Sequence, residues 1–207
     1  MLRHQLLDTS RGRIVTILQQ GELTVEEIAV KLKLTANAIR AQLAGMERDG
    51  VIRRVGRRPG TTRPSHVFQL TPEVEQLLSK AYIPLLTQLV DVFATALPAE
   101  QLNGLLRDAG RRLAEELPAA VGSKASLGNR VNAASKILNE QLGALTAVER
   151  NTGYVIRGKG CPLSALTGKH PAVCLALESL VTEIVGAPVH ECCDRASRPR
   201  CCFQIEA

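Results

Sequence analysis

All six cysteines of this 207-residue chain lie after residue 160, in the pattern C-x12-C-x17-CC-x7-CC. Thiolates bind soft metals such as zinc, copper(I), mercury and arsenic(III), and they hold iron–sulfur clusters. The pattern lacks the two C-x2-C knuckles of zinc fingers and the ferredoxin spacings. It therefore predicts a dispersed metal or redox site, whose candidate residues are Cys161, Cys174, Cys192, Cys193, Cys201 and Cys202.

Such a dispersed site has room for four protein ligands. We expect Cys161 from a loop, Cys174 from a helix, and one thiol from each adjacent cysteine pair. Successive side chains of a strand point to opposite faces, so only one thiol of each pair reaches a common site. In the expected last strand, alternation places Phe203 and Ile205 on the same face as Cys201, whereas Cys202 points to the other face.

Other readings of the thiols stay open at this point. His190 is an alternative ligand, whereas His170 is expected to begin a helix. A zinc, arsenic(III) or mercury site would use thiolates without sulfide. A disulfide switch would use the adjacent pairs with no metal at all.

The elements before the cysteines carry the excess positive charge. Residues 1–70 hold 12 Lys/Arg against 6 Asp/Glu, whereas residues 71–207 hold 14 of each. A basic segment joined to a neutral one predicts a polyanion partner for the first segment. With 3 Phe, 2 Tyr and no Trp, the chain has few rings for stacking single-stranded bases, which leaves duplex DNA.

The first 70 residues predict a helix-turn-helix followed by a basic hairpin. Residues 11–20 have helical spacing, and the sequence from Thr24 to Glu27 is a capping box that begins a second helix. Thr35 caps a third helix. Two strands, 51–55 and 66–70, then flank a loop rich in Gly, Pro and Arg.

In a winged helix, the second helix of the motif enters the major groove and the hairpin contacts the backbone or minor groove. Burial of Ile39, Leu43 and Met46 would leave one face of the third helix toward DNA. Asn reads adenine and Arg reads guanine through paired hydrogen bonds. The expected DNA-binding residues are Thr35, Asn37, Ala38, Arg40, Ala41, Arg53, Arg54, Arg57, Arg58 and Arg63.

The run LTANAIRAQLAGMERDGVIRRVGRRPGTTRP resembles the winged-helix repressors of the ArsR, DeoR and MarR type. In them a comparable sequence closes the recognition helix and begins the wing. The resemblance implies sequence-specific binding to double-stranded DNA. A protein-interaction or cluster-carrier module is the alternative from another functional class.

Beyond residue 70 the pattern predicts helices over about 73–95, bent at Pro84, and over 98–117, 123–142 and 170–185. Strands are expected at 144–150, 154–157, 189–193 and 200–206. The fold class is α+β and mostly helical. The expected domains are a winged helix at 1–72, dimerisation helices at 73–143 and a small cysteine-rich sensor domain at 144–207.

The segment from Cys161 to Cys174, CPLSALTGKHPAVC, together with the closing RCCFQI, resembles SufR-type iron–sulfur repressors over nearly the whole chain. The resemblance implies a winged-helix dimer with an oxygen-labile cluster, either 4Fe-4S or 2Fe-2S. It implies Cys161, Cys174, Cys192 and Cys201 as ligands, with Cys193, Cys202 and His190 as alternates. Zinc or no metal is the alternative cofactor state.

No catalytic triad, paired-carboxylate site or phosphate-cradling loop stands out, so we do not expect an enzyme. No stretch approaches the roughly 20 apolar residues of a membrane span, and we expect a cytoplasmic location. Groove-reading winged helices usually bind two half-sites, so we expect a homodimer on a palindromic operator. The predicted function is a regulator, most simply a repressor, that responds to oxygen, redox or iron status.

Overall fold

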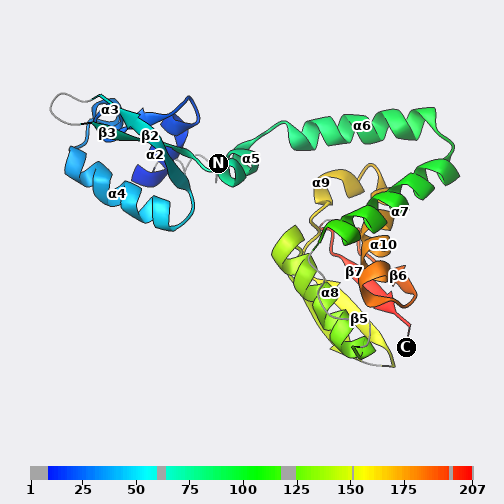
Figure 1. Cartoon of the computed structure of the whole chain (residues 1–207). Coiled ribbons are helices and arrows are strands. Elements are labelled where there is room, and N and C mark those ends of the chain that lie inside the picture. Colours follow the sequence, from blue (N-terminus) through cyan, green and yellow to red (C-terminus); the bar gives the residue numbers. More distant parts are fainter. Residues whose placement is uncertain (1–8, 60–63, 118–124, 151, 196–197, 207) are drawn as a thin grey trace. The chain divides into compact units, whose positions relative to one another are not determined.

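A computed structural model describes residues 9–59, 64–117, 125–150, 152–195 and 198–206 of the chain. The chain divides into two compact units, Met1–Lys80 (unit 1) and Ala81–Ala207 (unit 2), and each has its own hydrophobic core (Figure 1). The α+β class and the N-terminal winged helix-turn-helix are as predicted.

Unit 1 is a helical cluster with a small antiparallel sheet. Its strands have the order β1-β3-β2, and the predicted basic hairpin is the β2–β3 pair. The two-residue strand β1 was not predicted, because it is too short to show alternation. The elements are α2 (Ser10–Leu18), β1 (Leu23–Thr24), α3 (Val25–Leu32), α4 (Ala36–Arg48), β2 (Ile52–Arg58), β3 (Ser65–Leu70) and α5 (Pro72–Leu78).

Local sequence explains the helix-turn-helix. The backbone N–H of Thr24 donates to Glu27 Oε2 at 2.6 Å, and the Glu27 N–H donates to Thr24 Oγ1 at 3.3 Å, which confirms the capping box. Lys33 adopts a left-handed conformation with φ 55° and ends α3. The hydroxyl of Thr35 then accepts from Ala38 N–H and begins α4.

The core of unit 1 forms where the apolar faces of these helices meet the sheet. The predicted burial of Ile39, Leu43 and Met46 is confirmed, since each is at most 1% exposed. Burial of this face fixes which side of α4 is presented to solvent.

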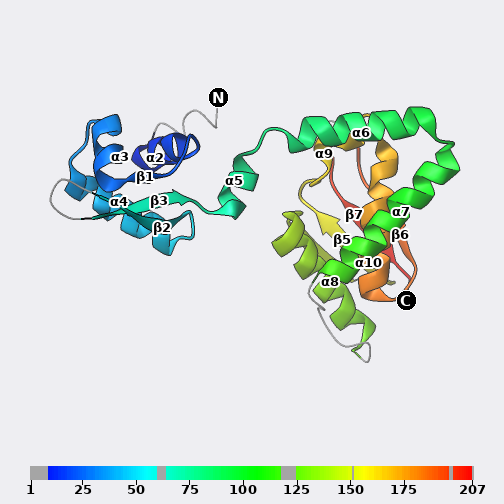
Figure 2. The same cartoon turned by 45° about the horizontal axis from the view of Figure 1, so that its top comes forward.

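In unit 2, α8 and α10 pack against a four-stranded antiparallel sheet of order β4-β5-β7-β6, and α7 packs on α10 (Figure 2). Ile156, Phe203 and Ile205 of the sheet share one buried core with residues of α8 and α10. The elements are α6 (Tyr82–Ala96), α7 (Ala99–Glu116), α8 (Leu127–Leu142), β4 (Thr146–Arg150), β5 (Tyr154–Gly158), α9 (Ser164–Thr167), η1 (Pro171–Val173), α10 (Cys174–Val185), β6 (Val189–Glu191) and β7 (Cys202–Ile205).

The helices α7 and α10 approach closely at Gly110. A Cβ placed on Gly110 would lie 2.0 Å from the backbone oxygen of Ala176 and 3.0 Å from Ser179 Cβ. Only glycine fits between the two helices, so this residue sets the distance at which α7 packs on α10.

The structure corrects two expected helices. The helix predicted over 73–95 is two helices, and the chain leaves helical geometry at residues 79–81 rather than bending at Pro84. Pro84 lies in the first turn of α6, where its missing N–H breaks no helical hydrogen bond. The helix predicted over 170–185 begins with the short 3-10 turn η1, and α10 starts at Cys174.

The expected boundary between residues 143 and 144 falls inside unit 2. Helix α8, from the expected dimerisation region, supplies Val131, Ala134 and Leu138 to the same core as Phe203 of the expected sensor domain. No single helix among the described residues is long and apolar enough to cross a membrane, although α5 and α6 taken together meet the length and composition test.

Candidate functional site

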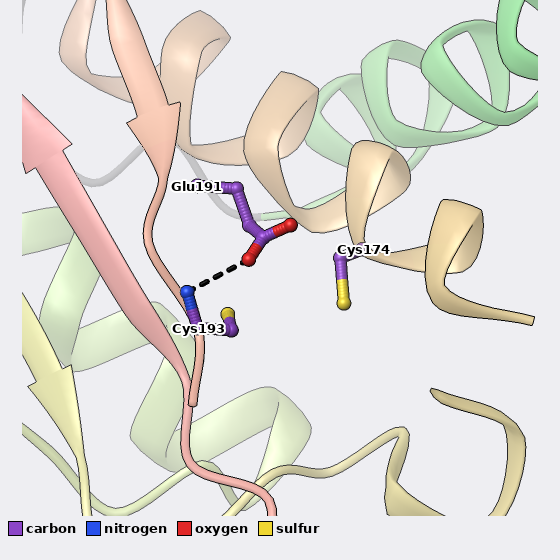
Figure 3. Close-up of side chains that lie close together, drawn as sticks. All are labelled: Cys174, Glu191 and Cys193. Carbon is purple, nitrogen blue, oxygen red and sulfur yellow. Dashed lines mark hydrogen bonds between the residues drawn. The ribbon is translucent and has the colours of Figure 1, made fainter. Parts of the chain in front are cut away.

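Three of the predicted cysteines meet at one end of the sheet of unit 2. Cys174 is the first residue of α10, Cys193 follows β6, and Cys201 precedes β7. The thiol of Cys193 forms hydrogen bonds with those of both Cys174 and Cys201. Figure 3 shows the sulfur of Cys174 facing Cys193. We call these three residues the inner thiols.

A carboxylate accompanies the inner thiols. Ligand atoms of Cys174, Glu191 and Cys193 all lie within 4.8 Å of one another. Glu191 Oε1 accepts a hydrogen bond from the Cys193 N–H at 2.7 Å (Figure 3), and its Oε2 is bonded to the Arg195 guanidinium. Because both carboxylate oxygens are engaged, Glu191 holds Cys193 in place and is a weaker candidate for a metal ligand than the thiols.

The thiols of Cys174 and Cys193 hold their protons tightly. A hydrogen bond with Cys193, and after it burial, raises the pKa of the Cys174 thiol well above its ordinary value. Arg195 opposes this rise. A hydrogen bond with Cys174 lowers the pKa of Cys193, but the hydrogen bond with Cys201 and burial outweigh it and raise that pKa to about 12. Crowded thiolates repel one another, so a bound cation is what would stabilise them together.

The loop that carries Cys161 is bonded to the start of β7. Gly160, the neighbour of Cys161, accepts a backbone hydrogen bond from Cys201 N–H at 3.2 Å, which joins the Cys161 loop to the start of β7. Cys161 is half-buried against the core of unit 2. With the inner thiols, Cys161 makes four free cysteines, and its loop is bonded to Cys201.

The structure places Cys192 away from the inner thiols, although it was an expected ligand. Cys192 and Cys202 form a disulfide, which corrects the prediction that Cys192 joins Cys174 and Cys201. The reason is register: Cys192 lies opposite Cys202, and its backbone N–H donates to the Cys202 carbonyl at 2.8 Å. Of the alternates, Cys193 lies beside Cys174 and Cys201, whereas Cys202, the alternate to Cys201, is bonded to Cys192.

His190, the other alternate, also points elsewhere. It pairs with Gln204 in the sheet, its side chain is 66% exposed, and Nε2 lies 3.2 Å from Glu206 Oε1. The strand-face prediction for β7 is confirmed, since Cys201 shares the buried core with Phe203 and Ile205.

One signal in the sequence favoured Cys193 and was missed. Val189, Glu191 and Cys193 are every second residue of one extended segment, and Val189 is apolar. Extending the alternation from Val189 puts Cys193, and not Cys192, on the inward face. The positioning roles of Glu191 and Arg195 had no comparable signal, because they depend on contacts with Cys193 and Cys174.

The segment between Cys161 and Cys174 is anchored to helix α6. Lys169 Nζ lies 2.6 Å from Asp91 Oδ2, and His170 Nε2 bonds the other oxygen of the same carboxylate. These bonds, that from Lys169 first, hold the pKa of Asp91 below its usual value. The neighbouring Val90 is buried against residues of α9 and η1. His170 thus precedes η1 as expected, but its ring contacts α6 and does not cap the turn.

The expected DNA-binding residues of α4 lie on its solvent face. Asn37, Ala38, Arg40 and Ala41 are all exposed. Arg40 Nη1 donates to Asn37 Oδ1 at 2.9 Å, and its Nη2 lies 3.1 Å from Glu26 Oε1. The two expected base readers are therefore bonded to each other in the free protein.

The arginines of the hairpin divide into paired and exposed ones. Arg54 bonds Glu47 at 2.8 Å, and Arg58 bonds both Glu22 and Glu27. Exposed ion pairs contribute only about 0–1 kcal/mol, so phosphate can replace the carboxylates at small cost. Arg53 and Arg57 are exposed, and Arg63 lies outside the described residues.

Comparison with known proteins identifies unit 1. Residues 8–54 match the family profile described as bacterial regulatory protein, arsR family. Unit 1 carries an ArsR-family helix-turn-helix domain. The match runs from α2 into β2, so the ArsR-family domain accounts for the helix-turn-helix and the start of the wing.

Unit 2 lies outside that match. Comparison with curated proteins gives no match. Among solved structures, a mutant of ZitR from Lactococcus lactis in its apo form is similar over 55% of this chain and 85% of that chain, with 17% sequence identity and a TM-score of 0.30. The similarity to bacterial regulatory proteins of the arsR family is confined to residues 8–54.

Proposed function

We propose that the protein binds duplex DNA sequence-specifically and that a thiolate-bound iron–sulfur cluster in unit 2 controls this binding. The observation that carries the proposal is the convergence of the reduced inner thiols, Cys174, Cys193 and Cys201, beside the Cys161 loop. Four thiols from four separate segments suit a bulky cluster better than a single small ion, since iron–sulfur clusters are held by cysteine thiolates.

The residues present fit such a group by their chemistry. In the proposal Cys161, Cys174, Cys193 and Cys201 are the ligands, and Cys193 replaces the Cys192 implied by the family resemblance. The cluster would supply one-electron chemistry and sensitivity to oxygen. Glu191 orients Cys193 through its N–H, and Arg195 places a positive charge beside Cys174.

The DNA-binding part of the proposal rests on the ArsR-family domain and its charges. The excess of 12 basic over 6 acidic residues lies in residues 1–70. The exposed face of α4 and the β2–β3 hairpin carry Arg40, Arg53, Arg54 and Arg57. Phosphate contacts of this kind make affinity fall steeply with salt.

We propose that helix α6 pairs two copies of the chain. Only Val90 of its 15 residues is buried. Its large exposed apolar side chains form a patch of the kind that marks a protein interface. They are Tyr82, Ile83, Leu85, Leu86, Leu89, Val92 and Phe93.

The proposed signal from the thiols to the DNA-binding domain passes through the contact between α6 and residues 164–173, which we call the sensor segment. Residues 164–173 lie between two proposed ligands and hold α6 through Val90 and Asp91. Loss of the cluster would release Cys161 and Cys174 and so loosen the anchor of α6. A change at the pairing helix would alter the spacing of the two ArsR-family domains on DNA.

Zinc sensing without sulfide is the second candidate function, since ligand atoms of Cys174, Cys193 and Glu191 lie within 4.8 Å of one another. Anaerobic reconstitution with iron and sulfide distinguishes the iron–sulfur proposal from the zinc candidate. The proposal expects about equal iron and acid-labile sulfide in the protein. Bound zinc without sulfide would favour the second candidate, and no bound metal of either kind would refute both.

A further inference from the structure

The sheet of unit 2 has a second face that carries a different kind of sulfur chemistry. Register places Ala147 opposite Arg157, Arg157 opposite Cys202, and Cys202 opposite Cys192. Residues directly opposite one another across strands share a face. Ile156 and Phe203, with the other parity, are buried under the helices. The Cys192–Cys202 disulfide therefore lies on the face that turns away from the helical core.

A hollow of about 560 Å³ adjoins this disulfide. Its volume is within the range of small-molecule sites. It is lined by Cys202, which is 4% exposed, and by the neighbouring free Cys201, but not by Cys192. Its walls come from β4, β5 and the segment before β7. The lining residues that matter here are Glu149, Arg157, Lys159, Asp194, Arg198 and Arg200.

The charges of the hollow leave an excess of cations. Arg157 lies 3.2 Å from Glu149, and Arg200 lies 2.9 Å from Asp194, so these four groups pair among themselves. Lys159 and Arg198 are exposed, and neither forms an ion pair within the part of the chain that the structure describes. A hollow with two unpaired cations attracts a small molecule that carries carboxylates.

We propose that this hollow binds a small anionic thiol, of the size of a tripeptide bearing carboxylates, which exchanges with the Cys192–Cys202 disulfide. The proposal goes beyond metal sensing, because the bond that reacts joins Cys192 and Cys202, and neither is a proposed metal ligand. It predicts that low-mass thiols of the cell reduce the Cys192–Cys202 disulfide.

The exchange follows from the position of the hollow. A thiol in the hollow approaches Cys202, and its thiolate attacks the Cys202 sulfur. The Cys192–Cys202 bond breaks, a bond between Cys202 and the small thiol forms, and Cys192 leaves as a thiolate that takes up a proton. Cys192 is exposed, so water stabilises the leaving thiolate. A second small thiol then releases Cys202 as a thiol and leaves as the small-molecule disulfide, so the protein disulfide is reduced by two electrons.

The test compares two small thiols on the full-length, air-oxidised protein. Glutathione carries carboxylates and a net negative charge, whereas cysteamine is cationic. At equal thiolate concentration and low salt, we expect glutathione to form the mixed disulfide about tenfold faster, as measured by intact mass after acid quenching. Added salt should shrink this preference in the unmodified protein.

A charge variant with a matched control locates the effect. Lys159→Ala with Arg198→Ala should abolish the preference for glutathione. Lys136→Ala with Arg112→Ala removes the same charge from exposed helix positions of unit 2 and should leave the preference unchanged. Fragmentation of the tryptic peptide 201–207, which contains Cys201 and Cys202, should place the adduct on Cys202 and not on Cys201.

Three results would overturn the proposal. They are equal rates for the two thiols, an adduct on Cys192 in place of Cys202, and free thiols at both positions in the air-exposed protein. Metal binding by the inner thiols can fail without any of these results, so the two proposals are tested separately.

Discussion

At the residue scale, the adjacent cysteines Cys192 and Cys193 have opposite surroundings. Cys193 meets Cys174 and Cys201 and has its N–H held by Glu191. Cys192 is bonded to Cys202 on the other face of the sheet. A difference of one position along the chain therefore decides whether a thiol belongs to the proposed metal site.

This difference gives a paired prediction. Cys193→Ser should abolish stable cluster or metal binding, because it removes the thiol that joins Cys174 to Cys201. Cys192→Ser should keep metal binding close to that of the unmodified protein. Iron, zinc and sulfide content after identical anaerobic reconstitution measures both. Loss of metal in Cys192→Ser with retention in Cys193→Ser would reverse our assignment.

A pH prediction concerns the capping box of α3. The backbone N–H of Thr24, and then other bonds including those from Arg58, lower the pKa of Glu27 below 4.5, while burial opposes them. A lowered folded-state pKa stabilises the protein above the unfolded pKa, and this contribution is lost as the pH falls through the folded-state value.

We therefore expect Glu27→Gln to lower the thermal stability of the protein at pH 7 and to have less effect near pH 3. Thermal unfolding followed by circular dichroism between pH 3 and pH 7 checks this. Glu75→Gln, in the first turn of α5, is a control for loss of charge at a helix start. A destabilisation that stays constant over the whole pH range would contradict the role given to the Glu27 carboxylate.

At the element scale, what could be predicted followed from local signals. The capping box and the apolar spacing of α3 and α4 are written within a few residues, and they placed the helix-turn-helix correctly. The hairpin followed from alternation and a Gly/Pro loop. The break between α5 and α6 was not predicted, because residues 79–81 contain neither Gly nor Pro.

The site was predictable only in part, because only some of its features follow from local sequence signals. Alternation indicated that one thiol of each pair is used, and it placed Cys201 correctly on the buried face. The choice between Cys192 and Cys193 depends on the register between β6 and β7, which is a long-range pairing. The anchoring of α6 by Asp91 joins residues 78 positions apart and left no local pattern.

Helix packing gives a prediction at this scale. Gly110→Ala would force a methyl group against the Ala176 carbonyl, so we expect it to destabilise unit 2 by about 1–3 kcal/mol. Gly104→Ala is the matched control on the same helix, since nothing lies within 4 Å of its added Cβ. It should be neutral or stabilise by up to about 1 kcal/mol. Chemical denaturation measures both, and equal effects would contradict the close approach of α7 and α10.

At the scale of the whole molecule, the proposed signal passes from the sensor segment to α6 and from there to the ArsR-family domains of a dimer. Asp91 is the polar part of this connection, and Val90 is the apolar part. Allosteric coupling of this kind is a free energy shared between two sites, so it can be weakened without damage to either site.

Asp91→Asn should therefore leave metal content unchanged and reduce the difference in DNA affinity between the metal-bound and metal-free protein. Asp108→Asn removes an exposed carboxylate paired with Arg111 on α7 and serves as the control. Fluorescence anisotropy with labelled operator DNA measures the affinities. An undiminished difference in Asp91→Asn would show that α6 is not the route.

The central claim is that occupancy of the inner thiols controls DNA binding. The most direct measurement is the affinity of one anaerobic, iron- and sulfide-loaded sample for an operator fragment selected from random DNA, before and after air removes the cluster. We predict a change in specific affinity of about 5–150-fold, with little change for unrelated DNA. Equal specific affinity before and after a documented loss of iron and sulfide would contradict the account.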